Sequence, residues 1–226
     1  MWAVFCLPLV AHADGDKPAI LMSSSSLPLT KWAYEKSEVK DVATGQIWMA
    51  IISKGYHYIA KSVNVTVKSY RDQMFETDMR AITVPKDTVL LVKGLPISEG
   101  QSIRSYPLNA TSLKPGKRII IDEYKDISLI SKLPTADPKN TTSRHYYQIY
   151  VVINGTQQVL TKPAEINMIH PKILWTGDIN NDAYPDFVIT TADHYAMFRP
   201  ILFISKKMGR TVHYTKVAQR EVWIDT

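Results

Sequence analysis

The feature that most constrains the fold is the pair Asn154-Gly155, which stands between two runs with strand character. Tyr146–Ile153 precedes the pair and is rich in aromatic and β-branched residues, and Thr156–Leu160 follows it. Asn-Gly favours the type I′ turn, whose twist matches that of two antiparallel strands. The pair therefore predicts a β-hairpin in the second half of the chain.

Short apolar runs bounded by turn residues recur along the rest of the chain. Ile47–Ile52 and Tyr56–Ile59 flank Lys54-Gly55 and predict a second hairpin. Residues 63–67 alternate valine with polar residues, which is the period-2 pattern of a half-buried strand. Further strands are expected at Thr88–Val92, Arg118–Ile121, Ile173–Trp175, Phe187–Thr190, Ile201–Ile204 and Val212–Ile224.

Strand signals at short intervals, without a long helical period between them, predict an all-β fold. The length of 226 residues allows one large domain or two small ones. We expect a β-sandwich-like domain over residues 27–165 and a small β-unit over 166–226. Trp32–Val42 fits either an amphipathic helix or an edge strand, whereas the polar, proline-containing segment Asp122–Arg144 predicts a long surface excursion.

The first thirteen residues have the character of a targeting segment. The apolar run Trp2–Val10 ends in Ala11-His12-Ala13, a small-x-small cleavage pattern, which predicts a signal peptide over residues 1–13. No Lys or Arg precedes the apolar run, which is also too short to span a bilayer core about 30 Å thick. Residues 14–26 include four consecutive serines and are expected to form a flexible leader.

The cysteine content and the net charge limit the cellular compartments and the binding partners that we expect for this protein. Cys6 is the only cysteine, so the mature chain would have neither a disulfide nor a thiolate nucleophile. An exported β-protein without cysteine is expected in a bacterial periplasm or among secreted proteins. The formal charge of +6 is dispersed along the chain, which predicts a soluble surface and no nucleic-acid partner.

A dense group of oxygen-bearing side chains follows the predicted strand at Ile173–Trp175. Asp178, Asn180, Asp182 and Asp186 occupy positions 1, 3, 5 and 9 of one loop. Hard oxygen donors at this density suit Ca²⁺. Three carboxylates this close repel one another by roughly 1–4 kcal/mol per pair near a protein surface. The loop therefore predicts a calcium site.

The segment Gly177–Ile189 resembles the calcium loop of the FG-GAP/VCBS repeat family, usually written Gly-Asp-x-Asn-Gly-Asp-Gly-x-x-Asp-Leu. In that family the loop joins two strands of a β-propeller blade. The resemblance implies that Asp178, Asn180, Asp182 and Asp186 bind Ca²⁺ through their side chains, and that Tyr184 offers its backbone carbonyl at position 7. The following stretch, 191–205, looks like the end of a group of uncharacterised exported bacterial proteins that carry one such unit.

The chain departs from the family pattern in two respects. No second Asp-x-Asn-x-Asp occurs at a repeat period, so a propeller is not expected, and the single unit is expected to pack on the preceding β-domain. Asn181 and Ala183 replace the usual glycines, and the bend at position 6 commonly needs a positive φ, which alanine resists. We therefore expect a strained loop that binds calcium more weakly than a loop with the usual glycines.

Two other loop types compete with this interpretation. An EF-hand is excluded because position 12 is Ile189 in place of Glu and because strands, not helices, flank the loop. The remaining alternative is an Asp/Asn-rich turn that is capped by its own side chains and binds no metal.

Two classes of function remain open. We favour a non-catalytic exported protein in which structural Ca²⁺ stiffens a module that binds an unknown protein or an envelope glycan. The alternative is an exported hydrolase whose site is assembled from distant residues. Asp193-His194 suggests a base beside a carboxylate, although neighbours on a strand point apart. A stacking surface of Tyr146, Tyr147 and Tyr150 is a further candidate.

Overall fold

The computed structural model describes residues 17–22, 31–74, 76–133, 146–162, 164–165, 170–191 and 197–223. Every regular element within these ranges is a β-strand, so the predicted all-β fold is confirmed. None of the described residues forms a helix with the length and apolarity that crossing a bilayer requires. The expected signal peptide, 1–13, lies outside the described residues, as do residues 14–16 and 23–26 of the expected flexible leader. The middle of that leader is not a loose segment, because Ala19–Leu21 forms strand β1, and Ile20 and Leu21 are fully buried in the core.

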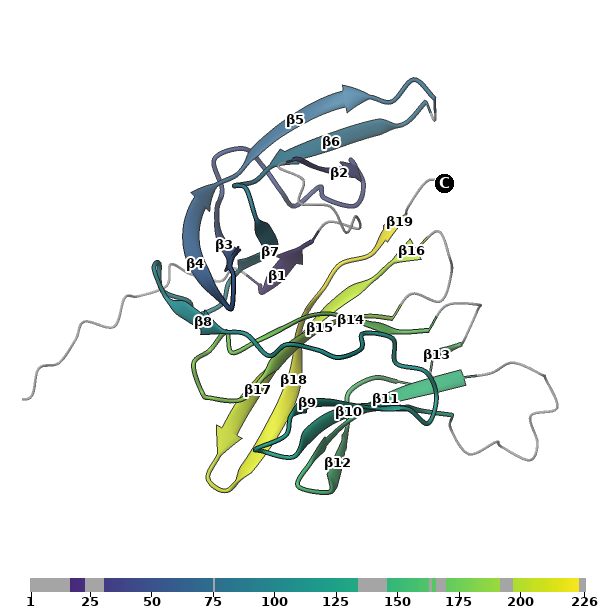
Figure 1. Ribbon diagram of the computed structural model, residues 1–226. Helices are drawn as coiled ribbons and strands as arrows, with labels where there is room; N and C mark the ends of the chain where they lie inside the picture. Colours follow the sequence, from purple (N-terminus) through teal and green to yellow (C-terminus); the bar gives the residue numbers. More distant parts are fainter. Residues whose placement is uncertain are drawn as a thin grey trace, which may run out of the picture.

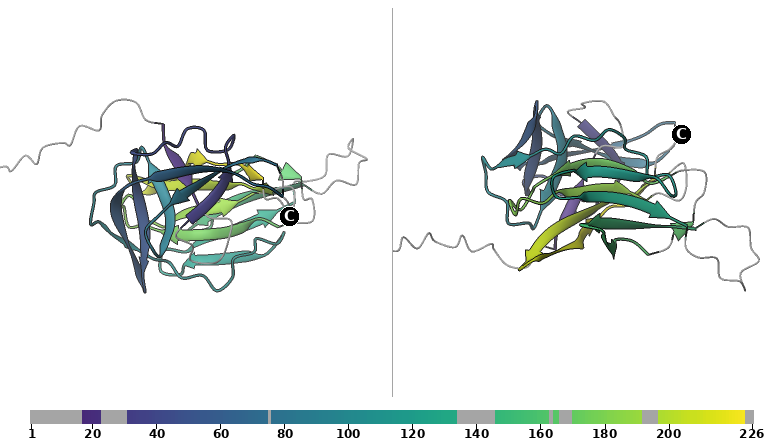
Figure 2. Two further views of the ribbon diagram at one scale, coloured as in Figure 1. Left: turned by 90° about the horizontal axis from the view of Figure 1, so that it is seen from above. Right: turned by 60° about the horizontal axis from the view of Figure 1, so that its bottom comes forward.

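The N-terminal half forms two antiparallel sheets, coloured purple to teal in Figure 1. A five-stranded sheet has the order β1-β7-β3-β4-β8, and a three-stranded sheet has the order β2-β6-β5. The strands are β1 Ala19–Leu21, β2 Lys31–Glu35, β3 Ile47–Lys54, β4 His57–Asn64, β5 Thr66–Arg71, β6 Asp78–Thr83, β7 Thr88–Lys93 and β8 Ser102–Arg104. In the left view of Figure 2, seen from above, these strands lie partly in front of the green and yellow strands of the second half.

Local patterns in this half are confirmed in part. β3 and β4 form the predicted hairpin around Lys54-Gly55. The alternating stretch at 63–67 is divided between the two sheets, because β4 ends at Asn64, β5 begins at Thr66 and the intervening Val65 is buried. Val65 points into the core at the corner where the chain passes from the first sheet to the second, so the alternation of valine and polar residues continues through the corner. The ambiguous segment 32–42 begins in strand β2 and continues as turns.

The second half forms two further antiparallel sheets and one short strand pair. One sheet has the order β12-β11-β10-β9, with β13 also pairing to β11, and the other has the order β14-β15-β17-β18. The strands are β9 Arg118–Asp122, β10 Ile127–Lys132, β11 Tyr146–Ile153, β12 Thr156–Val159, β13 Ala164–Glu165, β14 Lys172–Gly177, β15 Asp186–Thr190, β16 Met197–Phe198, β17 Pro200–Met208, β18 Thr211–Gln219 and β19 Val222–Trp223. β16 pairs with β19.

The predicted Asn-Gly hairpin is confirmed. β11 and β12 pair antiparallel up to Ile153 opposite Thr156. Asn154 and Gly155 have φ values of 48° and 78°, the left-handed values that a type I′ turn requires. The side chain of Gln158 in β12 then joins this sheet to β18, since its amide donates to Tyr214 O at 2.6 Å and accepts from Tyr214 N at 2.9 Å.

The expected surface excursion at 122–144 is wrong for its first part. Residues 127–132 form β10, which lies between β9 and β11 inside a sheet. Ser128 and Ser131 are fully buried, as are Ile127 and Leu129. Ser128 accepts a hydrogen bond from Arg118 Nε at 2.6 Å, so the polar composition conceals a strand that is covered on both faces.

The sheet β14-β15-β17-β18 is the middle of three layers, as Figure 1 shows. All five residues of β15 are buried. Val188 belongs to the core shared with the N-terminal sheets, whereas Phe187 and Ile189 belong to the core shared with the β9–β12 sheet. The C-terminal sheet therefore packs against structure on both of its faces, and the division into a domain over 27–165 and a small unit over 166–226 stays a prediction.

Candidate metal centre

The loop of residues 178–185 joins β14 to β15, and its two ends are held together by pairing of Gly177 with Asp186. Gly177 also bridges to Ser105, and Asp178 N donates to Arg104 O at 3.0 Å. A side chain at Gly177 would overlap the Trp175 ring, so glycine is required here by close packing rather than by a turn. The loop is thus anchored to the chain that follows β8.

The Asp178 side chain accepts hydrogen bonds from backbone N–H groups on the other side of the loop. Its Oδ1 accepts from Asp182 N at 3.0 Å and its Oδ2 accepts from Ala183 N at 2.8 Å. Asn180 Oδ1 lies 3.3 Å from the same Asp182 N. Asp178 is only 5% exposed, and this burial raises the pKa of its carboxyl above the ordinary value, against the hydrogen bonds from the backbone.

Asp186 connects the loop to β17 and is completely buried. Its Oδ2 accepts from Ile179 N at 2.7 Å, and its Oδ1 accepts from Ser205 N at 2.7 Å. The Ser205 hydroxyl lies 2.8 Å from the same Oδ1. Burial raises the pKa of Asp186 to about 8 in spite of these hydrogen bonds, so ionising it at neutral pH is costly in this environment.

Ser205 Oγ lies near more acceptors than its single proton can satisfy. It is 2.8 Å from Asp186 Oδ1, 3.0 Å from Asp182 Oδ1 and 3.5 Å from the Tyr184 carbonyl oxygen. A hydroxyl donates only one hydrogen bond. At least two of these three close oxygen pairs therefore lack a proton from Ser205.

Two buried polar atoms of this region have no hydrogen-bond partner among the described residues: Asp182 Oδ2 and the Tyr214 hydroxyl. Asp182 Oδ1 accepts from Tyr184 N at 2.9 Å, so only half of this carboxylate is satisfied. Burial raises the pKa of Tyr214, and the negative charges of Asp186 and Asp182 raise it further. Unpartnered buried polar atoms are expensive, so this pair calls for a polar or cationic group.

The bend of the loop has the strained geometry that the sequence predicts. Asn181 and Ala183 have φ values of 57° and 69°, and alanine rarely adopts this left-handed conformation. The Ala183 carbonyl accepts from the Tyr106 hydroxyl at 3.2 Å and from Lys125 Nζ. Lys125 also lies 4.5 Å from the centre of the Tyr184 ring. Tyr106 lies in the segment between β8 and β9, and Lys125 lies in the turn between β9 and β10, so both contacts hold the bend from outside the loop.

The structure brings together some of the predicted ligands and separates others. Asp182, Tyr184 O and Asp186 meet around Ser205, whereas Asp178 and Asn180 direct their oxygens at backbone N–H groups within the loop. As the side chains lie, no three His, Cys, Asp or Glu residues in the described part of the chain are arranged to hold a metal ion. Carboxylate, amide and carbonyl oxygens are the donor types that suit Ca²⁺, but the assignment of these residues as ligands stays a prediction.

Sequence reasoning missed Ser205 and Lys125. Ser205 directly follows the apolar run Ile201–Ile204, and a polar residue that continues a buried strand is a signal for an internal hydrogen-bond partner. Lys125 lies in the turn between β9 and β10, 58 residues from its partner Ala183, and nothing local indicates the contact.

The other predicted candidates lie elsewhere. Residues 193 and 194 are outside the described residues. Tyr147 is buried and its hydroxyl donates to Thr191 O at 3.1 Å, so its ring is part of the core. The Tyr150 hydroxyl donates to Gln148 at 2.7 Å, and Lys132 lies 5.3 Å from the centre of its ring. The side chain of residue 146 is not among those described.

His213 lines a pocket of about 500 Å³ in which the hydrolase alternative can be examined. The described lining supplies amide, hydroxyl and guanidinium groups around the histidine, from residues such as Gln157, Thr211 and Arg210. The described lining contains no carboxylate that would orient the histidine as a general base. The lining gives the hydrolase alternative no specific support.

A scan against protein-family models and searches among curated proteins and solved structures find no match to this chain. The likeness to an FG-GAP/VCBS loop therefore rests on the residues of the loop alone.

Proposed function

We propose that this chain is a non-catalytic exported protein in which the 178–186 loop binds one structural Ca²⁺. The observation that carries the proposal is the excess of buried carboxyl groups that have no cationic partner at the loop. Asp178 and Asp186 are buried, Asp182 has an unpartnered oxygen, and no salt bridge to these carboxylates occurs among the described residues. A divalent cation is the simplest group that relieves this excess.

The residues that would hold the ion are Asp178, Asn180, Asp182, Asp186 and the carbonyl of Tyr184. A carboxylate oxygen that already accepts one hydrogen bond retains a second lone pair, so the N–H contacts of Asp178 and Asp186 are compatible with coordination. Ca²⁺ accepts six to eight oxygen ligands in irregular arrangements, whereas Mg²⁺ requires a near-ideal octahedron. An irregular loop of this kind favours Ca²⁺.

The proposed role of the ion is structural. The loop is tied to the β8 side of the molecule through Asp178 N and Arg104 O, and to β17 through Asp186 and Ser205. Neutralising the loop would strengthen the junction between the layers. The protein ligands would leave the ion little room to activate a water, which argues against metal-assisted hydrolysis.

Calcium-dependent melting tests this proposal. With Ala183 in a strained bend, a Kd of about 10⁻⁴–10⁻³ M is expected, so a few millimolar Ca²⁺ should add roughly 1–2 kcal/mol to the free energy of unfolding. Asp182→Ala should abolish the gain, whereas Glu99→Ala, which removes an exposed carboxylate elsewhere, should keep it. A melting temperature that Ca²⁺ leaves unchanged, or that Mg²⁺ raises equally, contradicts the assignment.

Terbium luminescence gives a second readout of the same site. Tyr184 belongs to the loop and Tyr214 lies beside Asp186, so a Tb³⁺ ion in the loop should emit when tyrosine is excited, and Ca²⁺ should quench the emission by competition. Emission that survives both excess Ca²⁺ and Asp182→Ala would place the lanthanide elsewhere.

Export and the binding role are part of the same proposal. The apolar segment 2–10 and the Ala11-His12-Ala13 pattern predict a mature N-terminus at Asp14 in the periplasm or the medium. N-terminal sequencing of the natural protein measures this directly, and recovery of the chain from the cytosol with Met1 intact contradicts it. The partner, an envelope protein or glycan, should be recovered by the mature chain from envelope extracts more efficiently with Ca²⁺ than with a chelator.

A further inference from the structure

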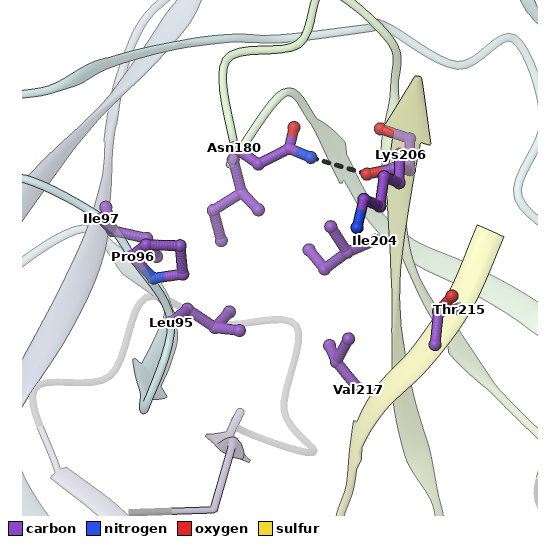
Figure 3. Close-up of a pocket in the computed structure, with 10 residues that line it drawn as sticks. Leu95, Pro96, Ile97, Asn180, Ile204, Lys206, Thr215 and Val217 are labelled. Carbon is purple, nitrogen blue, oxygen red and sulfur yellow. Dashed lines mark hydrogen bonds between the residues drawn. The ribbon is translucent and has the colours of Figure 1, made fainter. Parts of the chain in front are cut away.

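A pocket of about 370 Å³ opens beside the loop, between strands β17 and β18 and the turn that follows β7 (Figure 3). Its volume falls within the range of small-molecule sites, about 300–1,000 Å³. Segments far apart in the sequence form its walls, and the lining residues are Leu95, Pro96, Ile97, Ile179, Asn180, Ile204, Ser205, Lys206, Thr215 and Val217. The pocket is therefore a product of the packing between the layers.

The walls are aliphatic. Six of the lining residues carry apolar side chains, and these are leucine, isoleucine, valine and proline. The described lining contains neither an aromatic ring nor a carboxylate. A nucleobase would be expected to stack on aromatic side chains, and none is offered here. An aliphatic chain is the ligand that such walls match.

One cationic group stands at the mouth of the pocket. Lys206 is exposed, and in Figure 3 its side chain runs back along β17 toward Ile204. The ammonium of Lys206 has no hydrogen bond or ion pair to the described residues. The amide of Asn180 is already used, since Nδ2 donates to Ser205 O at 2.6 Å and Oδ1 accepts from Asp182 N. The hydroxyl of Thr215 also faces the pocket, so Lys206 is the charged group, and not the only polar one, that the described lining offers to a ligand.

The walls are held in place by hydrogen bonds that do not involve the pocket space. Gln101 Nε2 donates to Ile179 O at 2.8 Å, and Ile97 N donates to Leu95 O at 2.8 Å. The buried carboxylate of Asp186 accepts from Ile179 N on one wall and from Ser205 N on the other. A site prepared in this way loses little conformational entropy when a ligand enters.

We propose that this pocket binds an aliphatic monocarboxylate of medium chain length, with its chain between the aliphatic walls and its carboxylate paired with Lys206. A single lysine matches one negative charge, whereas phosphate groups are usually held by several donors or by an arginine fork. The proposal concerns a ligand of the binding module and does not depend on Ca²⁺ in the neighbouring loop.

Calorimetric titration with decanoate tests the proposal, with decanol as the uncharged probe and without added divalent cations. The expected Kd of decanoate is on the order of 10–100 µM. Lys206→Gln should weaken decanoate about tenfold and leave decanol unchanged. Lys207→Gln is the matched control, because Lys207 is the next residue of β17, is also exposed and does not line the pocket. Methyl NMR shifts should be confined to residues such as Leu95, Ile97 and Val217.

Several outcomes overturn the proposal. Decanoate that fails to saturate the protein, or that is weakened equally by Lys206→Gln and Lys207→Gln, shows that no specific site exists. Methyl shifts outside the pocket place the ligand elsewhere. Saturation by an apolar peptide with a free C-terminus, without saturation by decanoate, assigns the pocket to a protein partner. Both glutamine variants change exposed residues, so their melting temperatures should match that of the unchanged chain.

Discussion

Two parts of the molecule hold carboxylates in opposite ways. At one end of β18, Arg220 binds both oxygens of Asp41, at 2.6 and 2.8 Å, and also donates to Glu38 O at 2.7 Å. In the 178–186 loop, Asp178 and Asp186 accept hydrogen bonds from backbone N–H groups and from Ser205, without an ion pair to a described residue. The first carboxylate has its counter-charge within the chain, and the others do not.

The pKa values follow this difference. Hydrogen bonds from Arg220 lower the pKa of Asp41, whose side chain is 49% exposed. Burial raises the pKa of Asp178 and raises that of Asp186 to about 8. Hydrogen bonds from N–H groups therefore position a buried carboxylate but do not remove the free-energy cost of ionising it in the interior. The comparison teaches that geometry and neutralisation are separate requirements, and that the loop meets only the first from its own residues.

Removing the buried carboxylate should have the largest effect. Asp186→Ala leaves Ile179 N and Ser205 N without acceptors in the interior, so the free energy of unfolding should fall by about 3–5 kcal/mol. Urea unfolding monitored by tryptophan fluorescence measures this. Asp41→Ala is the matched change at the other carboxylate and should cost less, because Asp41 is half exposed. Equal losses in the two variants would break the comparison.

Removing the guanidinium should come next. Arg220→Ala leaves Asp41 unpaired and removes the donors to Glu38 O and to Ile20 O, so a loss of about 2–3 kcal/mol is expected. Arg220→Lys should recover only part of it, because an ammonium cannot reproduce the two-pronged contact. Full recovery with lysine in the same urea experiment would show that charge alone matters at this contact.

The pH dependence of the Asp41 contact should be smaller and has a definite sign. The folded-state pKa of Asp41 lies below its ordinary value of 3.8, so the unfolded chain takes up this proton first as the pH falls. The stabilisation is therefore present above pH 4 and is lost as the pH falls through the folded-state pKa. Because Asp41 is half exposed, solvent screening limits it to about 1 kcal/mol.

Asp41→Asn isolates this contribution. The difference in unfolding free energy between the unchanged chain and the variant should be constant from pH 5 to 7 and should narrow below pH 4. Urea unfolding at each pH provides the values. A difference that stays constant down to pH 3 would show that the carboxylate charge contributes nothing to the Arg220 contact.

Relaxing the bend of the loop should have the smallest effect and should be favourable. Ala183 has a φ of 69°, and glycine adopts this conformation without the steric cost of a Cβ. Part of the gain is offset by the greater freedom of glycine in the unfolded chain, so Ala183→Gly should raise stability by about 0.5 kcal/mol. The calcium midpoint of the melting shift should fall at the same time.

Asn181→Gly is the control for the bend. Asn181 has a φ of 57°, which asparagine tolerates, so this variant should change stability less than Ala183→Gly does. Differential scanning calorimetry with and without Ca²⁺ resolves the two. A larger gain at position 181 would mean that strain is not concentrated at Ala183.

Local chemistry could be predicted from the sequence alone. Asn154-Gly155 specifies its turn because the left-handed φ values are a property of those two residues. The bend at Ala183 is likewise set within nine residues, since Asp178 accepts hydrogen bonds from Asp182 N and Ala183 N. Interactions that close over a few residues leave a pattern in the sequence, and for this reason the hairpin and the shape of the loop were foreseeable.

Only the tertiary structure decided which strands are covered and what surrounds the loop. β10 is central in its sheet although its serines indicate a surface, because its neighbours β9 and β11 and the packing of the layers determine burial. Ser205 reaches Asp186 across 19 residues of chain, and Lys125 reaches Ala183 across 58. The aliphatic pocket exists only where segments 95–97, 179–180 and 204–217 meet. Contacts between distant segments depend on how the layers pack. That packing cannot be predicted from the residues of any one segment alone.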